Sequence, residues 1–470
     1  MRKGLWKFLM VLLCIAILAV LPLAGMFAYA WNQPATYKES YYAALPLKYD
    51  RLKSVKEEKI VVIGGSSTAF GIDSKIVEEE LGMPCVNFGL YAALGFKPML
   101  DLSLKEIQKG DIVILAPEIS AQMFSDYVGY EFLLQAIEER PDMAYALGHD
   151  YTKGFLANFR GYVRDAKKLR QNGGFVANSI YALSSFDDYG DIVYERPENV
   201  MDTMYSMDNL PELCSDIVTD SFAGMVNEYV QKVQKKGANV YFSFCPVNAM
   251  SAEQIPDSDK KGFVEALEEK LDCEVIGSLE DHLMDAGYFY DSNFHTNDSG
   301  CVYNTVLLVN DIKRVTGKMT VTQTKLPEPP AAGDNAVIAS GSDELFTYDV
   351  TAAGVVITGL TEEGKKKESL EVPKVEDNYT VYKIGPMAFA GAKAKEIILP
   401  STISSLGSSP FSDADELEVV FLRSQNLPEI GSGLLKDAND KLVIKVPKDL
   451  YGNYVTDYFW GEFASSIEEE

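Results

Sequence analysis

Between about residues 59 and 316, short apolar runs alternate with longer amphipathic stretches, and this alternation constrains the fold more than any other feature. The apolar runs are hydrophobic on both faces, as the buried strands of a parallel sheet are. In chain order they read KIVVIG, MPCVNFG, DIVILAPE, ANVYFSFCPV and CEVIG. Stretches between them, such as SKIVEEELG, have helical periodicity, and several end in the glycine expected after a helix. The pattern predicts a three-layer α/β fold, with helices on both faces of a parallel sheet.

A different period begins after a proline-rich segment. Residues 319–344 include TKLPEPPAAGDNAVIASGSDE, which has no apolar periodicity and is interpreted as a linker. Beyond it, IGPMAFAGA, LGSSPFSDA and IGSGLLKDA begin at positions 384, 406 and 430 and share an aliphatic–glycine pair followed by Phe or Leu four residues after the glycine. Units of about 22–24 residues cannot each bury their apolar face alone. We therefore expect a stacked solenoid over residues 345–470.

The first 31 residues combine a basic start with a long uncharged run. Arg2, Lys3 and Lys7 precede or flank 23 uncharged residues at 8–30, and about 20 apolar residues suffice to cross a bilayer. The positive charges predict a cytoplasmic N-terminus, with everything after residue 31 outside the cell. A single-pass membrane anchor is the first interpretation. The alternative is a signal peptide cleaved near AYA at 28–30, which would give a secreted protein.

Charge and cysteine content exclude several classes of function. The chain has 470 residues and a formal net charge of −26, which repels nucleic acid and anionic lipid. The cysteines lack the spacing of a metal site, and neither a phosphate-binding loop nor a dinucleotide fingerprint occurs. We therefore expect no cofactor, no metal and no nucleic-acid partner, and contact with the membrane only through 8–30. Five cysteines follow the apolar run: Cys85, Cys214, Cys245, Cys273 and Cys301.

One serine turn and one histidine stand out as candidate catalytic groups. GGSST, at 64–68, follows the first predicted strand and opens a helix, which places Ser66 and Ser67 at the carboxyl edge of the sheet. A serine nucleophile needs a base and a group that orients the base. His295 lies in the loop YDSNFHTND, with Asp291 four residues before it. Either feature alone is also common as a structural turn. The other two histidines are interpreted as structural: His149 and His282.

The order of these blocks resembles the SGNH (GDSL-like) hydrolase superfamily over about 59–316. GGSST and the FGID after it resemble the nucleophile block, with Gly65 where the family has an aspartate. The resemblance implies a three-layer α/β/α, flavodoxin-like domain at 32–318. It also implies a catalytic triad in which Ser66 is the nucleophile and Ser67 the alternative. The other two members would be Asp291 and His295, although the family more often spaces this pair as D-x-x-H.

The resemblance also addresses the oxyanion, the oxygen that becomes negative when an ester carbonyl is attacked. VNFGLYAALG resembles the second block of the family, which implies backbone donors at about Gly89 to Ala92 and a turn shaped by Asn87. The family's Gly-x-Asn-Asp block is replaced by VILAPEIS, which lacks that asparagine and carries Glu118. Loss of one oxyanion donor costs about 10²–10³ in rate. Glu118 is predicted to lie at the crevice as an acceptor or a substrate contact, and Asn248 is a further candidate donor.

Residues 119–210 interrupt the alternation and are interpreted as a lid or as a packed helical excursion.

Two hypotheses for function follow. The repeats resemble the leucine-rich repeats of bacterial cell-surface antigens. Together with the membrane-anchored, acyl-transfer branch of the SGNH superfamily, they imply an exported serine esterase or O-acyltransferase that acts on acyl groups of cell-envelope glycans. The alternative is a non-catalytic surface adhesion or scaffold protein that binds a ligand through its repeats.

Overall fold

The computed structural model covers most of the chain after residue 31, and the predicted membrane span at 8–30 lies almost wholly outside the described residues. Within the described part, no helix is both long and apolar enough to cross a bilayer. Before residue 32 only positions 6, 10, 25, 26 and 29 are described. The described ranges after it are 32–171, 180–201, 204–207, 209–318, 320–330, 337–376, 378–431, 433–439, 441–457 and 460–470.

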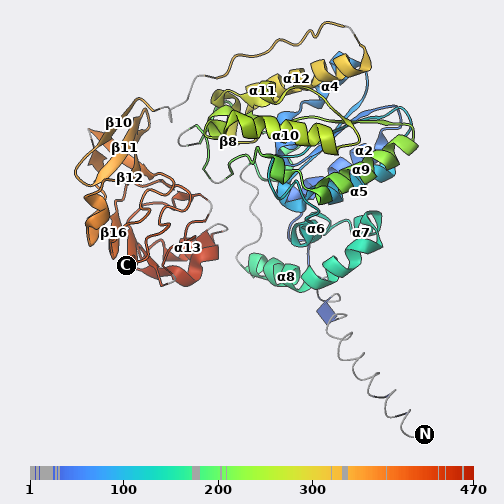
Figure 1. The fold of residues 1–470 in the computed structure, drawn as a ribbon. Helices are drawn as coiled ribbons and strands as arrows, with labels where there is room; N and C mark the ends of the chain where they lie inside the picture. The colour runs from blue at the N-terminus through green and yellow to red at the C-terminus, as the bar shows by residue number, and fades with distance from the viewer. Residues whose placement is uncertain are drawn as a thin grey trace.

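The first domain, several of whose helices are labelled in Figure 1, is built on a five-stranded sheet in the order β2-β1-β3-β4-β6. Neighbouring strands are parallel throughout, and Val62 lies opposite both Asn87 and Ile114. Each strand comes from one of the predicted apolar runs, so the expected parallel sheet is confirmed. The strands are β1 (Ile60–Gly64), β2 (Cys85–Gly89), β3 (Ile112–Ala116), β4 (Asn239–Phe242) and β6 (Glu274–Val275).

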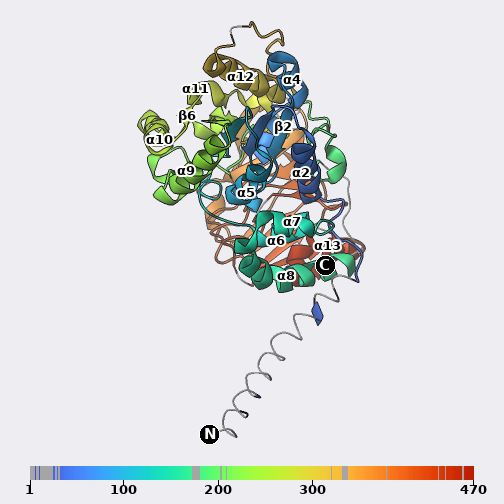
Figure 2. The same cartoon turned by 90° about the vertical axis from the view of Figure 1, so that its right-hand side faces the viewer.

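Helices cover both faces of this sheet (Figure 2). Val61 and Ile63 of β1 face one core, and Ile60 and Val62 face the other. Burial on both sides explains why the strands are apolar at every position. The first core is closed by α2 (Ala44–Ser54), α5 (Phe96–Glu106), α9 (Asp220–Lys235) and α10 (Asp257–Lys270). The second is closed by α4 (Ser74–Leu81) and α12 (Asp298–Thr316).

Shorter elements lie at the ends of the sheet. The helix that follows β1 is α3 (Ser66–Gly71), and a small hairpin pairs β8 with β9 just before α12. The remaining short elements of the first domain are η1 (Tyr41–Ala43), η2 (Ala92–Leu94), η5 (Ser215–Ile217), β5 (Val247–Asn248), η6 (Ala249–Ala252), α11 (Leu279–His282), β7 (Leu283–Met284), η7 (Ala286–Tyr288), β8 (Phe289–Ser292) and β9 (His295–Thr296).

The interruption predicted at 119–210 has two different parts. Its first part is helical, as the packed-excursion interpretation expects, and α6 packs against α8. Its second part, described over 180–201, has little regular structure and lies against β2 and the start of α4, where Asp191 accepts hydrogen bonds from Ser74 N (2.7 Å) and Asn87 Nδ2 (3.0 Å). The elements are α6 (Tyr130–Ala136), α7 (Asp142–Leu147), η3 (His149–Tyr151), α8 (Thr152–Gln171) and η4 (Leu183–Ser185).

A buried polar cluster fastens this second part to the sheet. Lys48 of α2 donates to the backbone carbonyls of Asn87 (3.1 Å) and Gly190, and Asn87 in turn donates to the carbonyl of Thr68 (3.2 Å). Burial lowers the pKa of Lys48 to about 7, although the nearby Asp191 works in the opposite direction. Burial also raises the pKa of Asp191 to about 6, although hydrogen bonds and Lys48 oppose it.

The C-terminal part consists of stacked short strands. One sheet has the order β13-β16-β18-β20-β21, with every pair parallel. Glu396 lies opposite Val419 and Val419 opposite Val443, which reproduces the predicted period. Its strands are β13 (Ser369–Glu371), β16 (Glu396–Leu399), β18 (Val419–Leu422), β20 (Val443–Val446) and β21 (Ile467–Glu469).

A second sheet runs along the same stack and begins with an antiparallel meander. Its first strand, β10, lies inside the segment interpreted as a linker and pairs with β11. From β12 onward the main ladder is parallel, and β14 pairs antiparallel with β15 at its side. The strands are β10 (Ala339–Ser342), β11 (Phe346–Thr351), β12 (Gly354–Leu360), β14 (Val375–Glu376), β15 (Tyr379–Ile384), β17 (Ser405–Leu406) and β19 (Glu429–Ile430). The stretch between β12 and β13 holds η8 (Gly364–Lys366).

The repeated large side chains fill the space between the two sheets. Phe389 and Phe411 are fully buried, and their rings stack with centroids 5.8 Å apart. In the third unit the equivalent Leu435 is half-buried, and its neighbour Leu434 supplies the fully buried side chain. The last turn of the stack is closed by α13 (Tyr451–Thr456) and η9 (Trp460–Ser466), where the Trp460 indole donates to the carbonyl of Pro428 (2.8 Å).

The lowered pKa of Lys48 predicts a pH-dependent stability. The unfolded chain keeps the Lys48 proton up to about pH 10.4, whereas the folded chain loses it near pH 7. Between these values the unfolded state binds more protons, so stability rises with pH. Between pH 7 and 9, the free energy of unfolding of the unaltered chain should therefore rise by about 2 kcal/mol relative to that of Lys48→Met. Urea unfolding at the two pH values measures this difference.

Lys53→Met serves as the matched control, because Lys53 is exposed on the same helix. It should follow the unaltered chain at both pH values. If the free energy of unfolding changes between pH 7 and 9 by the same amount in the unaltered chain and in Lys48→Met, the lowered pKa is contradicted.

Candidate active site

Ser66 and Glu118 lie at the carboxyl edge of the sheet, after two neighbouring strands. Ser66 opens α3 just after β1, and Glu118 follows the end of β3. In the sheet, β1 connects outward to β2 on one side, and β3 connects outward to β4 on the other. The connections that follow β1 and β3 therefore leave in opposite directions. In open α/β sheets, ligands bind in the crevice at such a switch point. The nucleophile turn predicted from GGSST therefore stands at the position where this kind of sheet places its ligands.

Two glycines allow α3 to lie close over the strand ends. A side chain at Gly89 would meet Thr68 Cβ at 2.4 Å, a distance that real contacts do not reach. A side chain at Gly65 would meet Glu118 Oε1 at 3.0 Å. Gly65 stands where the resembled family has an aspartate, so the missing side chain leaves room here for the Glu118 carboxylate.

Ser66, His295 and Asp291 form a continuous chain of hydrogen bonds. The distance from Ser66 Oγ to His295 Nε2 is 2.7 Å, and His295 Nδ1 lies 2.8 Å from Asp291 Oδ1. Both distances are within the reach expected between a nucleophile, its base and the group that orients the base. Ser66 and His295 are 4% and 9% exposed. The structure thus brings the three predicted triad residues together, while their catalytic roles stay a prediction.

The hairpin of β8 and β9 positions the Asp–His pair. Asp291 lies on β8 and His295 opens β9, so the four-residue spacing between them spans a tight turn. The His295 ring stacks on Phe70 of α3, with ring centroids 4.0 Å apart and an angle of 10° between the planes. Thr296 Oγ1 donates to the carbonyl of Phe70 (2.8 Å). These contacts hold the imidazole against the helix that carries Ser66.

Asp291 is held in its ionised form by its hydrogen bonds. Burial acts to raise its pKa, but the hydrogen bond and charge of His295, together with a hydrogen bond from Tyr181, bring the pKa below its ordinary value. Tyr181 donates its hydroxyl to Asp291 Oδ2 at 2.7 Å. An ionised carboxylate at this place can fix the imidazole tautomer and stabilise an imidazolium.

Glu118 contacts the candidate nucleophile directly. Its Oε1 accepts hydrogen bonds from Ser66 Oγ (2.5 Å) and from the backbone N–H of Ser67 (2.6 Å), and the residue is 6% exposed. Glu118 therefore lies beside Ser66 at the carboxyl edge of the sheet, while its role stays a prediction. Its carboxylate oxygen also engages a backbone N–H beside the nucleophile, a kind of donor that stabilises an oxyanion in acyl-transfer enzymes.

The other residues predicted around the oxyanion have structural partners. Asn87 shapes the turn as expected, because its Nδ2 donates to Thr68 O and its Oδ1 accepts from Gly89 N–H (3.2 Å). That bond directs the Gly89 N–H toward Asn87. Ala92 opens η2, and its carbonyl accepts from Gly95 N (2.9 Å). Asn248 Nδ2 donates to the carbonyl of Met204 (2.7 Å), so this amide is committed to the backbone.

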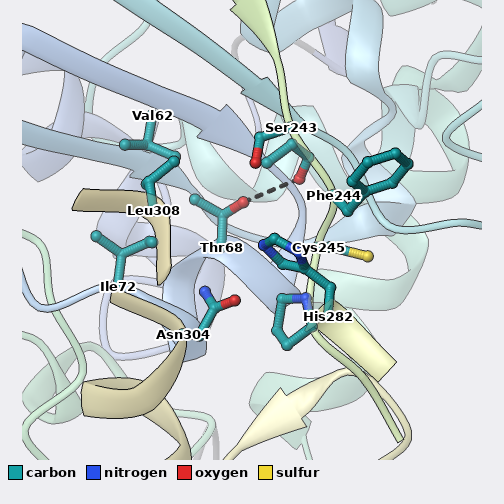
Figure 3. Close-up of a pocket in the computed structure, with 11 residues that line it drawn as sticks. Val62, Thr68, Ile72, Ser243, Phe244, Cys245, His282, Asn304 and Leu308 are labelled. Carbon is teal, nitrogen blue, oxygen red and sulfur yellow. Dashed lines mark hydrogen bonds between the residues drawn. The ribbon is translucent and has the colours of Figure 1, made fainter. Parts of the chain in front are cut away.

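Ser67, the alternative nucleophile, points into the protein. Its side chain is fully buried, and within the described part of the chain its Oγ has no hydrogen-bond partner. A small cavity of about 10 Å³ lies behind α3, lined in part by Thr68, His282 and Asn304 (Figure 3). That volume suits one water at most, and the lining includes no member of the candidate triad. The cavity therefore belongs to the packing behind the site.

The remaining histidines and the cysteines lie outside the candidate triad. His149 is exposed and lies 3.0 Å from Asp150, and His282 is buried with Nδ1 2.9 Å from Ser278 O. Burial lowers the pKa of His282. Among the described residues the five cysteines are free thiols, and no cluster of His, Cys, Asp or Glu side chains is suited to hold a metal.

Sequence reasoning missed two residues that touch the triad. Tyr181 comes from the second part of the insertion and contacts Asp291. Phe70 lies in FGID and stacks on His295. The sequence signal for Tyr181 is an insertion rich in tyrosine, and the signal for Phe70 is an aromatic residue one helical turn after Ser66. Neither signal indicates that the residue contacts the loop of Asp291 and His295.

Comparisons with known proteins give weak similarities. No family model and no curated protein matches the chain. A leucine rich cell surface protein from Faecalibacterium prausnitzii A2-165 is 20% identical over 25% of this chain and 35% of its own length, with a TM-score of 0.20. A leucine-rich repeat protein from Bacteroides capillosus ATCC 29799 is 15% identical over 22% of this chain and 97% of its own length, with a TM-score of 0.19.

The protein YXIM_BACsu from Bacillus subtilis is 13% identical over 56% of this chain and 58% of its own length, with a TM-score of 0.28. This chain thus spans about a third of the F. prausnitzii protein and less than two thirds of the B. subtilis one. The chain is similar to leucine-rich repeat cell-surface proteins over a small share of its length. Similarities of this size leave the function to be argued from its own residues.

Proposed function

We propose that the chain is an exported serine esterase or O-acyltransferase of SGNH type that acts on acyl groups of cell-envelope glycans. The observation that carries the proposal is the hydrogen-bond chain from Ser66 Oγ through His295 to Asp291. A buried serine and histidine followed by a half-buried aspartate, joined in this order, are the parts that acyl transfer needs. The glycan substrate and a membrane anchor at 8–30 rest on the family resemblance and on the apolar N-terminus.

The proposed reaction has two halves. Ser66 Oγ attacks the ester carbonyl while His295 Nε2 accepts the hydroxyl proton, and Asp291 stabilises the imidazolium that forms. His295 then returns the proton to the leaving alcohol, which leaves an acyl group on Ser66. In the second half, His295 activates water or a sugar hydroxyl, which takes the acyl group and frees Ser66. General acid–base catalysis of this kind contributes about 10²–10⁴ in rate.

Glu118 must change its contacts before this reaction can begin. Ser66 has one hydroxyl proton, and in the structure that proton is donated to Glu118 Oε1. Attack on a carbonyl requires the proton to go to His295 Nε2 instead. A carboxylate beside a developing oxyanion is also repulsive, because like charges a few ångströms apart interact strongly in a buried site. We therefore expect substrate to displace the Glu118 carboxylate from Ser66 and Ser67.

The alternative function is a non-catalytic surface scaffold that acts through its repeats. Its specific support is the same Glu118 carboxylate, which covers the reactive side of Ser66. The two functions differ in one consequence, the reactivity of Ser66 toward an electrophile.

A fluorophosphonate probe tests this reactivity. We predict that the full chain is covalently labelled, that Ser66→Ala and His295→Ala abolish labelling, and that Ser67→Ala keeps it, since Ser67 Oγ points away from His295. Gel fluorescence and peptide mass spectrometry measure labelling and its position. A folded chain that is not labelled at all would support the scaffold, and labelling lost only in Ser67→Ala would move the nucleophile to Ser67.

Substitution of Glu118 tests its role beside the nucleophile. Glu118→Gln removes the charge and keeps the size, so we predict that fluorophosphonate labelling becomes faster by about tenfold, which is less than the 10²–10³ that one oxyanion contact is worth. Glu212→Gln is the matched control. Glu212 accepts from the backbone of Ala121 and lies outside the triad contacts, so its rate should not change. Slower labelling of Glu118→Gln would instead make the carboxylate a required part of the site.

A further inference from the structure

Tyr181 completes the hydrogen bonding of the candidate catalytic aspartate. Asp291 has two carboxylate oxygens: Oδ1 faces His295 Nδ1 at 2.8 Å, and Oδ2 accepts the Tyr181 hydroxyl at 2.7 Å. The same hydroxyl lies 3.4 Å from His295 Nδ1. The phenol thus stands at the junction of the two residues whose mutual orientation the proposed reaction requires.

The Tyr181 ring is held in an aromatic cluster that includes the partner of His295. It packs edge-on against Tyr41, with ring centroids 5.6 Å apart, and lies 6.3 Å from Phe70, which stacks on His295. The ring is still 36% exposed. Its hydroxyl therefore contacts Asp291 while part of the residue remains at the surface of the molecule.

The backbone around Tyr181 is anchored to the start of the domain. Ala182 forms an antiparallel bridge with Ser40, and Leu183 N donates to the carbonyl of Glu39 (2.9 Å). The segment at 180–186 therefore has a fixed place beside the aromatic cluster. This anchoring brings one residue of the insertion to the triad.

The hydroxyl is a donor under ordinary conditions. Burial raises the pKa of Tyr181 well above its ordinary value, and the negative charge of Asp291 adds to this effect. A hydrogen bond from a neutral hydroxyl to a carboxylate is charge-assisted and stronger than one between neutral groups. With only one hydrogen bond, a carboxylate can turn about its side-chain axis. With both oxygens bound in one plane, it cannot.

We propose that Tyr181 is a positioning residue for the triad, which holds Asp291 Oδ2 so that Oδ1 faces His295. This inference rests on the proposed function and adds to it that the insertion supplies part of the catalytic arrangement. A small displacement of a catalytic group is costly, since about 1 Å can reduce a rate 10²-fold. Loss of the Tyr181 hydroxyl should therefore lower the rate of the chemical step without affecting substrate binding.

The variant Tyr181→Phe removes the hydroxyl and keeps the ring. With an aryl acetate as substrate and the full chain as enzyme, we expect kcat to fall about tenfold, which is a part of the 10²–10⁴ that acid–base catalysis contributes, and KM to stay within twofold. Tyr41→Phe is the matched control, because its hydroxyl belongs to the same cluster but donates to the carbonyl of Leu90 (3.1 Å). It should leave both constants within twofold.

A second measurement keeps the inference testable if the chain does not hydrolyse the ester. In protein labelled with ¹⁵N-histidine, the His295 Nδ1–H signal, assigned by its loss in His295→Gln, should shift in Tyr181→Phe and stay in place in Tyr41→Phe. An unchanged kcat in Tyr181→Phe would overturn the inference and leave the proposed function standing. A chain without Ser66-dependent activity would refute the proposed function. In that case, an unchanged His295 Nδ1–H signal in Tyr181→Phe would also overturn the inference.

Discussion

The hydrogen bond between Ser66 and His295 joins two loops that are 229 residues apart in the chain, and much of the domain serves to keep these loops together. Side chains in the first half of α12 bind the backbone at the end of α3 and just after it: Asn304 Nδ2 donates to Gly71 O at 2.8 Å, and Thr305 Oγ1 accepts from Asp73 N at 2.9 Å. These contacts and the Ser66–His295 bond are buried or partly buried. Hydrogen bonds in such a setting favour one arrangement over others, so the approach of the imidazole to the serine is built into the packing.

The order of the strands explains where the charged groups of the site come from. Ser66 and Glu118 follow β1 and β3, which are adjacent in the sheet, so their loops meet at the switch point. In the resembled family an asparagine donor follows the third strand, whereas here a carboxylate stands two residues after β3 and binds the nucleophile. The small Gly65 makes this contact sterically feasible. The contact between Glu118 and the Ser66 turn therefore depends on the absence of a side chain at Gly65.

Much of the fold could be predicted from the sequence, because it depends on local patterns. Apolar runs buried on both faces indicated the parallel strands, and the repeated positions around Phe389 and Phe411 indicated the stack at the C-terminus. Ser66, Asp291 and His295 could be chosen as candidates because each lies in a short block of recognisable order. Tyr181 and Asp191, and the direct contact of Glu118 with Ser66, were harder to assign. Their partners are distant in the chain, and no periodicity predicts how an irregular segment such as 180–201 lies against a sheet.

The central claim is that Ser66 carries an acyl group during turnover, and the most direct test is to detect that group. The full chain is mixed with excess aryl acetate, quenched in acid within milliseconds to seconds, digested and analysed by mass spectrometry. The account predicts an acetyl group on the peptide that contains Ser66, which appears before steady state and is absent in His295→Ala. Ester turnover with no acetylated Ser66 at any time, or with the acetyl group on another residue, would contradict it.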